Sequence, residues 1–146
     1  MPLPRILPDQ KAMNATSESA RARLAVVLRM WVPVLAWMAL IFVLSSQPSL
    51  PRAPDDLLDT LLKKGAHFGE YLILAILVSR ALFARGAISW RAKVVALGIA
   101  VAYAVSDELH QGLVPGRTPS PWDVGIDAFG AISGMTLFAW WRDSRR

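Results

Sequence analysis

The chain alternates between long apolar segments and short charged ones. Four apolar segments cover about residues 28–47, 65–84, 92–112 and 122–141. An α-helix rises about 1.5 Å per residue, so about 20 helical residues cross the roughly 30 Å hydrocarbon core of a bilayer. The pattern therefore predicts an all-α integral membrane protein, built as a four-transmembrane-helix bundle.

Three of these four segments reach the required length only by including ionisable residues. The first carries no charge after Arg29, whereas the second includes His67 and Glu70, the third includes part of "DELHQ" at 107–111, and the fourth carries Asp127. A charged side chain inside a membrane costs several kcal/mol, so such groups usually face the bundle interior or a water-filled cavity. We therefore expect a polar cavity inside the bundle.

The distribution of basic residues predicts the orientation of the chain. Lysine and arginine gather in three regions, whereas the two other connections carry most of the acids. The basic residues of the three regions are Arg5, Lys11, Arg21, Arg23 and Arg29, then Arg80, Arg85, Arg91 and Lys93, then Arg142, Arg145 and Arg146. Because cytoplasmic loops are enriched in lysine and arginine, both termini are predicted to be cytoplasmic. The polar ends of the last three segments then face outward.

Composition supports the membrane class and excludes several kinds of site. Hydrophobic residues make up 54% of the 146 residues, and the chain has no cysteine, which excludes disulfides, thiolate metal sites and cysteine nucleophiles. The net charge of +5 comes from residues flanking apolar segments and not from one basic patch, so no nucleic-acid partner is expected. We divide the chain into a polar, mobile tail at 1–23, a membrane domain at 24–141 and a basic tail at 142–146.

Helical phase gathers the polar residues of each segment on one face. At about 100° per residue, Lys64, His67, Glu70 and Tyr71 share an arc of about 120°. The preceding segment 54–64 has leucines at helical spacing, and it is predicted to form a short helix on the membrane surface.

The third segment repeats this arrangement at its polar end. Tyr103, Asp107, His110 and Gln111 share one face, and Glu108 lies at the edge of that face.

In the fourth segment, Asp123, Asp127, Gly130 and Gly134 lie within about 60° of one another. The two glycines have the small-xxx-small spacing that lets membrane helices approach closely. Whatever packs on them is expected to cover Asp127 as well.

The connection "VPGRTPSPWD" predicts a turn followed by a helix start. Pro115 and Gly116 indicate the turn, while Ser120 and Pro121 are typical of an N-cap and a first helical position. Asp123 then falls in the first turn, where capping and the helix dipole explain an acid. Arg117 is the only cation of the connection, and it can fold back over the acids or bind an incoming anion.

At these residues the sequence resembles the VanZ-like family of small bacterial membrane proteins. The matching motifs are "SSQP", "KGAHFGEY" and "DELHQGLVPGRTPSPWDVGIDAFGAISG", and Leu113 and Lys63 depart from the residues that are frequent in the family. The resemblance implies a multi-pass protein of the bacterial inner membrane and cell envelope. The namesake of the family is associated with low-level resistance to the glycopeptide teicoplanin, but the resemblance implies no established reaction.

The clustered polar residues allow three readings of function. As an enzyme acting on a lipid-linked headgroup at the outer leaflet, the protein would use candidate catalytic residues and candidate ligand-binding residues. The former are His67, Glu70, Asp107, Glu108, His110 and Asp127, and the latter are Lys64, Tyr71, Gln111 and Arg117. Two histidines with carboxylates can hold zinc or manganese, or transfer protons. The same cluster can instead bind a lipid or other ligand without chemistry, or only hold the bundle together. The oligomeric state is left open.

Overall fold

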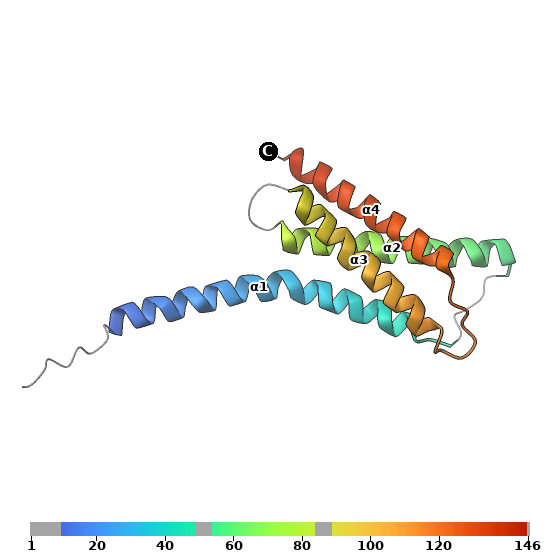
Figure 1. Cartoon of the computed structure of the whole chain (residues 1–146), viewed down its shortest axis with the longest axis horizontal. Coiled ribbons are helices and arrows are strands. Elements are labelled where there is room, and N and C mark those ends of the chain that lie inside the picture. Colours follow the sequence, from blue (N-terminus) through green and yellow to red (C-terminus); the bar gives the residue numbers. More distant parts are fainter. Residues whose placement is uncertain (1–9, 49–53, 84–88, 146) are drawn as a thin grey trace, which may run out of the picture.

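Four α-helices make up the chain wherever the computed structural model describes it, namely residues 10–48, 54–83 and 89–145 (Figure 1). The helices are α1 (Gln10–Ser45), α2 (Asp56–Leu82), α3 (Trp90–Gln111) and α4 (Pro121–Asp143). The described residues contain no strand, which confirms the all-α prediction.

Three of the helices, α1, α2 and α4, are long and apolar enough to cross a membrane. Helix α3 has sufficient length, but the polar residues of its last turns lower its mean hydropathy. The membrane-protein class is thus supported, while the crossing of α3 and the cytoplasmic position of both termini stay predictions.

Two helices begin earlier than the sequence pattern predicts. Helix α1 extends out to Gln10, into the predicted mobile tail, because residues of high helix propensity continue a helix even where they are too polar for the membrane. Helix α2 is one continuous helix of 27 residues, so the separate surface helix predicted at 54–64 is wrong. Asp55 caps it by accepting a hydrogen bond from the Leu58 backbone N–H at 2.9 Å, and no proline interrupts the chain before Leu82.

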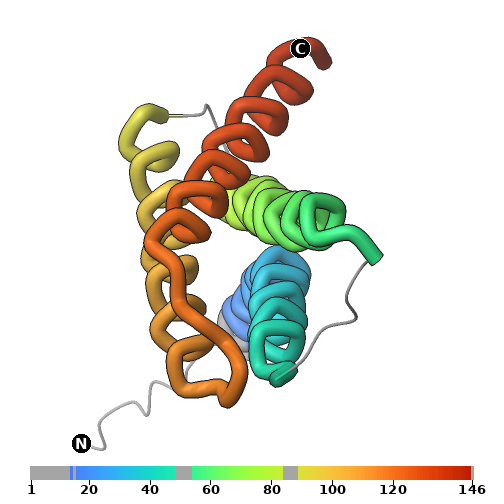
Figure 2. Tube along the Cα trace, turned by 90° about the vertical axis from the view of Figure 1, so that its right-hand side faces the viewer, coloured from blue at the N-terminus to red at the C-terminus, as the bar shows by residue number. Residues whose placement is uncertain are grey.

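The helices are arranged around α2. Helix α4 packs most extensively on α2, and α1 contacts only α2 and α3 among the described elements. Figure 2 shows α1 below α2, with α4 crossing over α2 and α3 alongside. The ends of α1 and α3 lie at the same end of the bundle as the starts of α2 and α4 (Figure 1). This shared end holds the polar residues.

Small residues set the distance between α2 and α4. A Cβ added at Gly130 would collide with the backbone carbonyl of Phe68, and one added at Gly134 with that of Leu72. Backbone can therefore approach backbone only because both positions lack a side chain. This close contact leaves Asp127, one turn before Gly130, completely buried, as the glycine spacing predicts.

Helix α1 joins the bundle through its second half only. Val34 and Ile41 are buried against Tyr71, Leu74 and Val78 of α2, whereas the described side chains between 14 and 29 are all exposed. Two further hydrogen bonds fix this half of the helix. The Trp37 indole donates to the Glu70 carbonyl at 2.9 Å, and the Tyr103 hydroxyl donates to the Met38 carbonyl at 2.5 Å.

Candidate functional site

The centre of the polar cluster is a contact between α2 and α4. His67 Nδ1 lies 3.2 Å from Asp127 Oδ1, and the Asp127 side chain has no exposed surface. Asp127 Oδ2 is also buried, and it has no hydrogen-bond partner within the described structure. The buried carboxylate therefore orients the imidazole while keeping one oxygen unpaired.

Glu108 of α3 approaches the same point from the third helix. Its Oε2 accepts a hydrogen bond from the Ser120 backbone N–H at 2.7 Å, and its Oε1 is buried without a hydrogen-bond partner in the described ranges. One ligand atom each from His67, Glu108 and Asp127 lie within 4.8 Å of one another. Sequence reasoning placed Glu108 only at the edge of its helix face, and the structure brings it into the centre.

The contact with Ser120 explains why the helical phase of α3 did not reveal that Glu108 lies in the central cluster. Ser120 is the N-cap residue of α4 and Pro121 occupies the first helical turn, as predicted, but the Ser120 hydroxyl makes no capping hydrogen bond. Glu108 accepts from the backbone N–H of Ser120 itself, which is a different donor from the one that a capping hydroxyl serves. The sequence does contain a signal for this contact. An acid lies near the end of one predicted helix, and a serine-proline pair lies at the start of the next.

Asp107 and Gln111 form a second buried pair along α3. The Gln111 amide donates to Asp107 Oδ2 at 3.1 Å, whereas Asp107 Oδ1 and the Tyr71 hydroxyl are buried without a hydrogen-bond partner among the residues described. The predicted polar face of α3 is thus turned inward, and Leu109 on the opposite side is 70% exposed.

His110 is held by α1 and not by the central cluster. Its Nε2 lies 2.9 Å from the Ser46 hydroxyl, and its ring stacks on Phe42 with the ring centroids 4.4 Å apart. The atoms that lie close to His67 come from Glu108 and Asp127, so the structure does not bring the two histidines together as one ligand pair. Ser46 belongs to the "SSQP" motif, to which sequence reasoning assigned no contact.

The basic residues predicted for the site make internal contacts. Arg117 donates to the carbonyls of Gln47 at 3.1 Å and Leu44 at 3.3 Å, and it thereby ties the loop to the end of α1. Lys64 Nζ lies 2.9 Å from Asp123 Oδ1. The predicted role of Asp123 as a helix cap is therefore incomplete, because its side chain pairs with Lys64 of α2.

Replacing Asp123 by asparagine is expected to change the free energy of unfolding by less than about 1 kcal/mol, because partly exposed ion pairs contribute little. The side chains of Lys64 and Asp123 are 43% and 22% exposed. Unfolding of the purified variant by SDS in mixed micelles would measure the change. A loss several times larger would show that this ion pair is a main connection between α2 and α4.

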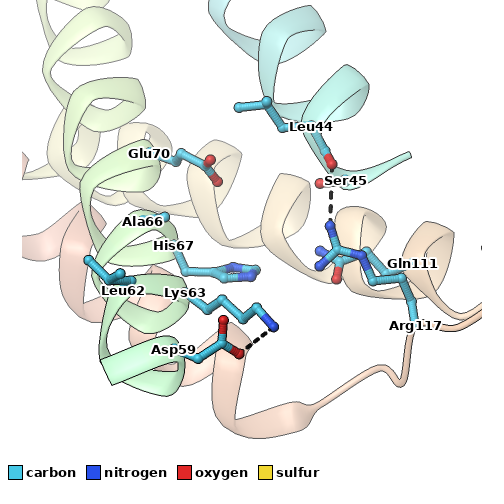
Figure 3. A pocket seen from close by; sticks show the side chains of 10 residues that line it. All are labelled: Leu44, Ser45, Asp59, Leu62, Lys63, Ala66, His67, Glu70, Gln111 and Arg117. Atoms are coloured by element: carbon cyan, nitrogen blue, oxygen red, sulfur yellow. Dashed lines mark hydrogen bonds and ion pairs between the residues drawn. The ribbon is translucent and has the colours of Figure 1, made fainter. Parts of the chain in front are cut away.

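A partly open pocket lies beside the cluster (Figure 3). Its volume is about 190 Å³. It is lined by Leu44, Ser45, Asp59, Leu62, Lys63, Ala66, His67, Glu70, Gln111 and Arg117. Figure 3 shows the His67 ring and the Arg117 guanidinium projecting into it from opposite sides, with Glu70 on the α2 wall. A second, more polar pocket of about 280 Å³ shares His67, Gln111 and Arg117 and continues toward Lys64 and Asp123.

Comparison with known proteins identifies the family. The family model described as VanZ/LLP1 matches residues 30–142. The chain belongs to the VanZ-like family. No curated protein and no solved structure matches it. The match includes the second half of α1 and nearly all of α2, α3 and α4, so every residue of the central cluster of this VanZ-like protein lies within the family domain.

Proposed function

We propose that this VanZ-like protein acts on the headgroup of a lipid-linked envelope precursor at the outer leaflet of the bacterial inner membrane. The observation that carries the proposal is that His67, oriented by the buried Asp127, projects into a pocket whose wall also holds Lys63 and Arg117. In this proposal both termini are cytoplasmic, and the pocket faces the outside.

The pocket combines the two properties that a phosphate-bearing headgroup requires. Arg117 supplies positive charge, and a guanidinium pairs well with phosphate oxygens. Lys63 is a second cation of the wall, and it pairs with Asp59 at 2.6 Å, a contact that a phosphate would have to share or replace. His67 uses Nδ1 toward Asp127, which leaves its other ring nitrogen for a proton transfer in the pocket. Glu70 lines the same pocket and is the second group able to accept a proton there.

The proposed substrate also accounts for an effect on antibiotic susceptibility. The namesake of the family is associated with resistance to teicoplanin, a glycopeptide, and a protein that alters envelope precursors would change the response to such compounds. We expect deletion of the protein to change teicoplanin susceptibility, and the His67→Gln variant to behave like the deletion.

The alternative is a membrane protein that binds a lipid or ligand without chemistry. The contacts of Arg117 with α1, of Lys64 with Asp123 and of Glu108 with Ser120 favour this reading, because each joins two helices or a helix and a loop. A polar cluster used only in this way stabilises the bundle around a binding pocket. It requires no proton transfer at His67.

Conversion of a defined lipid distinguishes the two functions. The purified protein would be placed in nanodiscs containing a polyprenyl diphosphate-linked disaccharide, and products would be measured by mass spectrometry. We expect His67→Gln to lower the rate by about 10²–10⁴-fold, the usual contribution of a general acid or base. His110→Gln is the matched control, because His110 contacts Ser46 and Phe42 outside the pocket.

Each outcome of this experiment assigns the protein to one reading. Binding of the lipid without conversion would support the non-enzymatic function. Equal rates for the wild type and a folded His67→Gln protein would refute the role of His67. A loss of folded protein in both histidine variants would indicate a structural network.

A further inference from the structure

The strongest unassigned feature is the donor set formed by His67, Glu108 and Asp127. One nitrogen and two carboxylate oxygens, contributed by α2, α3 and α4, lie within 4.8 Å of one another. The set is enclosed, since Asp127 is 0% and Glu108 5% exposed. An enclosed set of converging donors differs from an acidic patch at the surface, where solvent satisfies each carboxylate separately.

Both carboxylates of the donor set have one oxygen without a hydrogen-bond partner among the described residues. Glu108 Oε1 and Asp127 Oδ2 are both buried, and neither has a hydrogen-bond partner in the part of the chain that the structure describes. Buried polar groups are nearly always paired, so two unpaired carboxylate oxygens next to one imidazole require an explanation. Asp107 Oδ1 is a third such oxygen.

The basic residues nearby do not compensate these acids by direct contact. Lys64 binds Asp123, and Arg117 donates to the carbonyls of Leu44 and Gln47. Among the described residues, His67 is the only basic side chain in contact with Asp127. With both carboxyl groups ionised, the cluster carries more negative charge than its direct partners balance, and a cation bound between the donors would balance it.

We infer that His67, Glu108 and Asp127 bind one divalent cation of the kind that accepts both imidazole nitrogen and carboxylate oxygen, such as Mn²⁺ or Zn²⁺. Metal–ligand bonds of about 2.0–2.2 Å place neighbouring ligand atoms about 3–3.5 Å apart. The 3.2 Å between His67 Nδ1 and Asp127 Oδ1 meets this requirement. The other donor atoms lie within 4.8 Å, so the carboxylates would have to move closer together to hold the ion. The absence of cysteine fits a site of nitrogen and oxygen donors.

This inference deepens the proposed function and rests on it for the role of the ion. An ion with three protein ligands keeps a position for water or a phosphate oxygen, and it acts as a Lewis acid toward that group. With the ion bound, His67 acts as a ligand in place of the general acid or base role given to it above, and Glu70, which lines the same pocket, is the group left to transfer a proton there. The cation would bind beside the wall that carries Lys63 and Arg117, where the phosphate is proposed to lie.

Metal binding can be measured without any substrate. The protein would be purified in detergent, stripped with EDTA and dialysed against MnCl₂ or ZnCl₂, and bound metal would be counted by elemental mass spectrometry. We expect about one ion per chain and a higher unfolding temperature with the metal than with EDTA. Asp127→Asn and Glu108→Gln are each expected to weaken binding at least tenfold, while Asp123→Asn and Asp59→Asn, acids outside the donor set, are expected to bind as the wild type does.

The wild-type measurement alone can overturn the inference. Binding of neither metal at one equivalent, with no change in unfolding temperature, would refute the site even if the variants failed to fold. Equal weakening by Asp123→Asn would also refute it, because it would indicate general attraction to acids. Conversion of lipid by protein shown to be free of metal would refute the role of the ion in the reaction and preserve the proposed function. A protein that binds metal but converts no lipid would support the metal site and contradict the proposed function.

Discussion

Replacing Gly134 by alanine is expected to lower the free energy of unfolding of the bundle by about 3 kcal/mol, the upper part of the range for overpacked cores. The added methyl group would meet the backbone carbonyl of Leu72, which cannot move aside as a flexible side chain can. Helices α2 and α4, the most extensive contact of the fold, would have to separate. Asp127, buried by the same contact, would gain access to water.

Gly125→Ala is the matched control for this prediction. Gly125 lies in the same helix, but a Cβ there has no heavy atom within 4 Å. Alanine is the better helix former, so this variant is expected to keep or gain up to about 1 kcal/mol. The free energies of unfolding of the two variants would be compared by SDS unfolding in mixed micelles. The yield of folded protein from membranes would be compared as well. Equal stability of the two variants would show that α2 and α4 are not in close contact.

Replacing His67 by alanine is expected to cost about 3 kcal/mol or more, because removing one partner of a buried hydrogen-bonded pair leaves the other without its partner. The remaining partner is Asp127, which has no exposed side-chain surface and no second hydrogen-bonded partner in the described ranges. Much of this loss should be recovered in the double variant His67→Ala/Asp127→Asn, since an amide is easier to bury than an unpaired carboxylate.

A double-mutant cycle in metal-free micelles measures this coupling. The two single variants, the double variant and the wild type would be unfolded under one set of conditions with EDTA present. Additive losses would contradict a direct interaction between His67 and Asp127. A double variant that is folded but does not convert lipid would separate the stabilising contribution of this pair from its proposed chemistry.

Helical phase predicted the parts of the site that depend on one helix. Asp127, Gly130 and Gly134 share a face, and helix packing on the two glycines required that Asp127 be buried, as the structure confirms. The inward position of Asp107 and Gln111 and the outward position of Leu109 follow from the same geometry.

The parts of the site that depend on the pairing of helices could not be predicted in this way. Phase gives the side of α3 on which Glu108 and His110 lie, but not which neighbour each of them meets. Glu108 reaches Ser120 and the central cluster, whereas His110 reaches Ser46, which directly follows α1. The lengths of α1 and α2 were missed because polarity marks the membrane boundary and not the end of a helix.

The composition of the pocket wall determines how a ligand would reach it. Leu44 of α1 and Leu62 of α2 line the pocket and are 40% and 60% exposed, so apolar surface adjoins the polar groups. An amphiphile can therefore enter sideways while its hydrocarbon chain stays in the bilayer. Its occupancy would then depend on its mole fraction among the lipids and not on its bulk concentration. Diluting it with neutral lipid in the same nanodisc should lower occupancy, whereas diluting the whole sample should not.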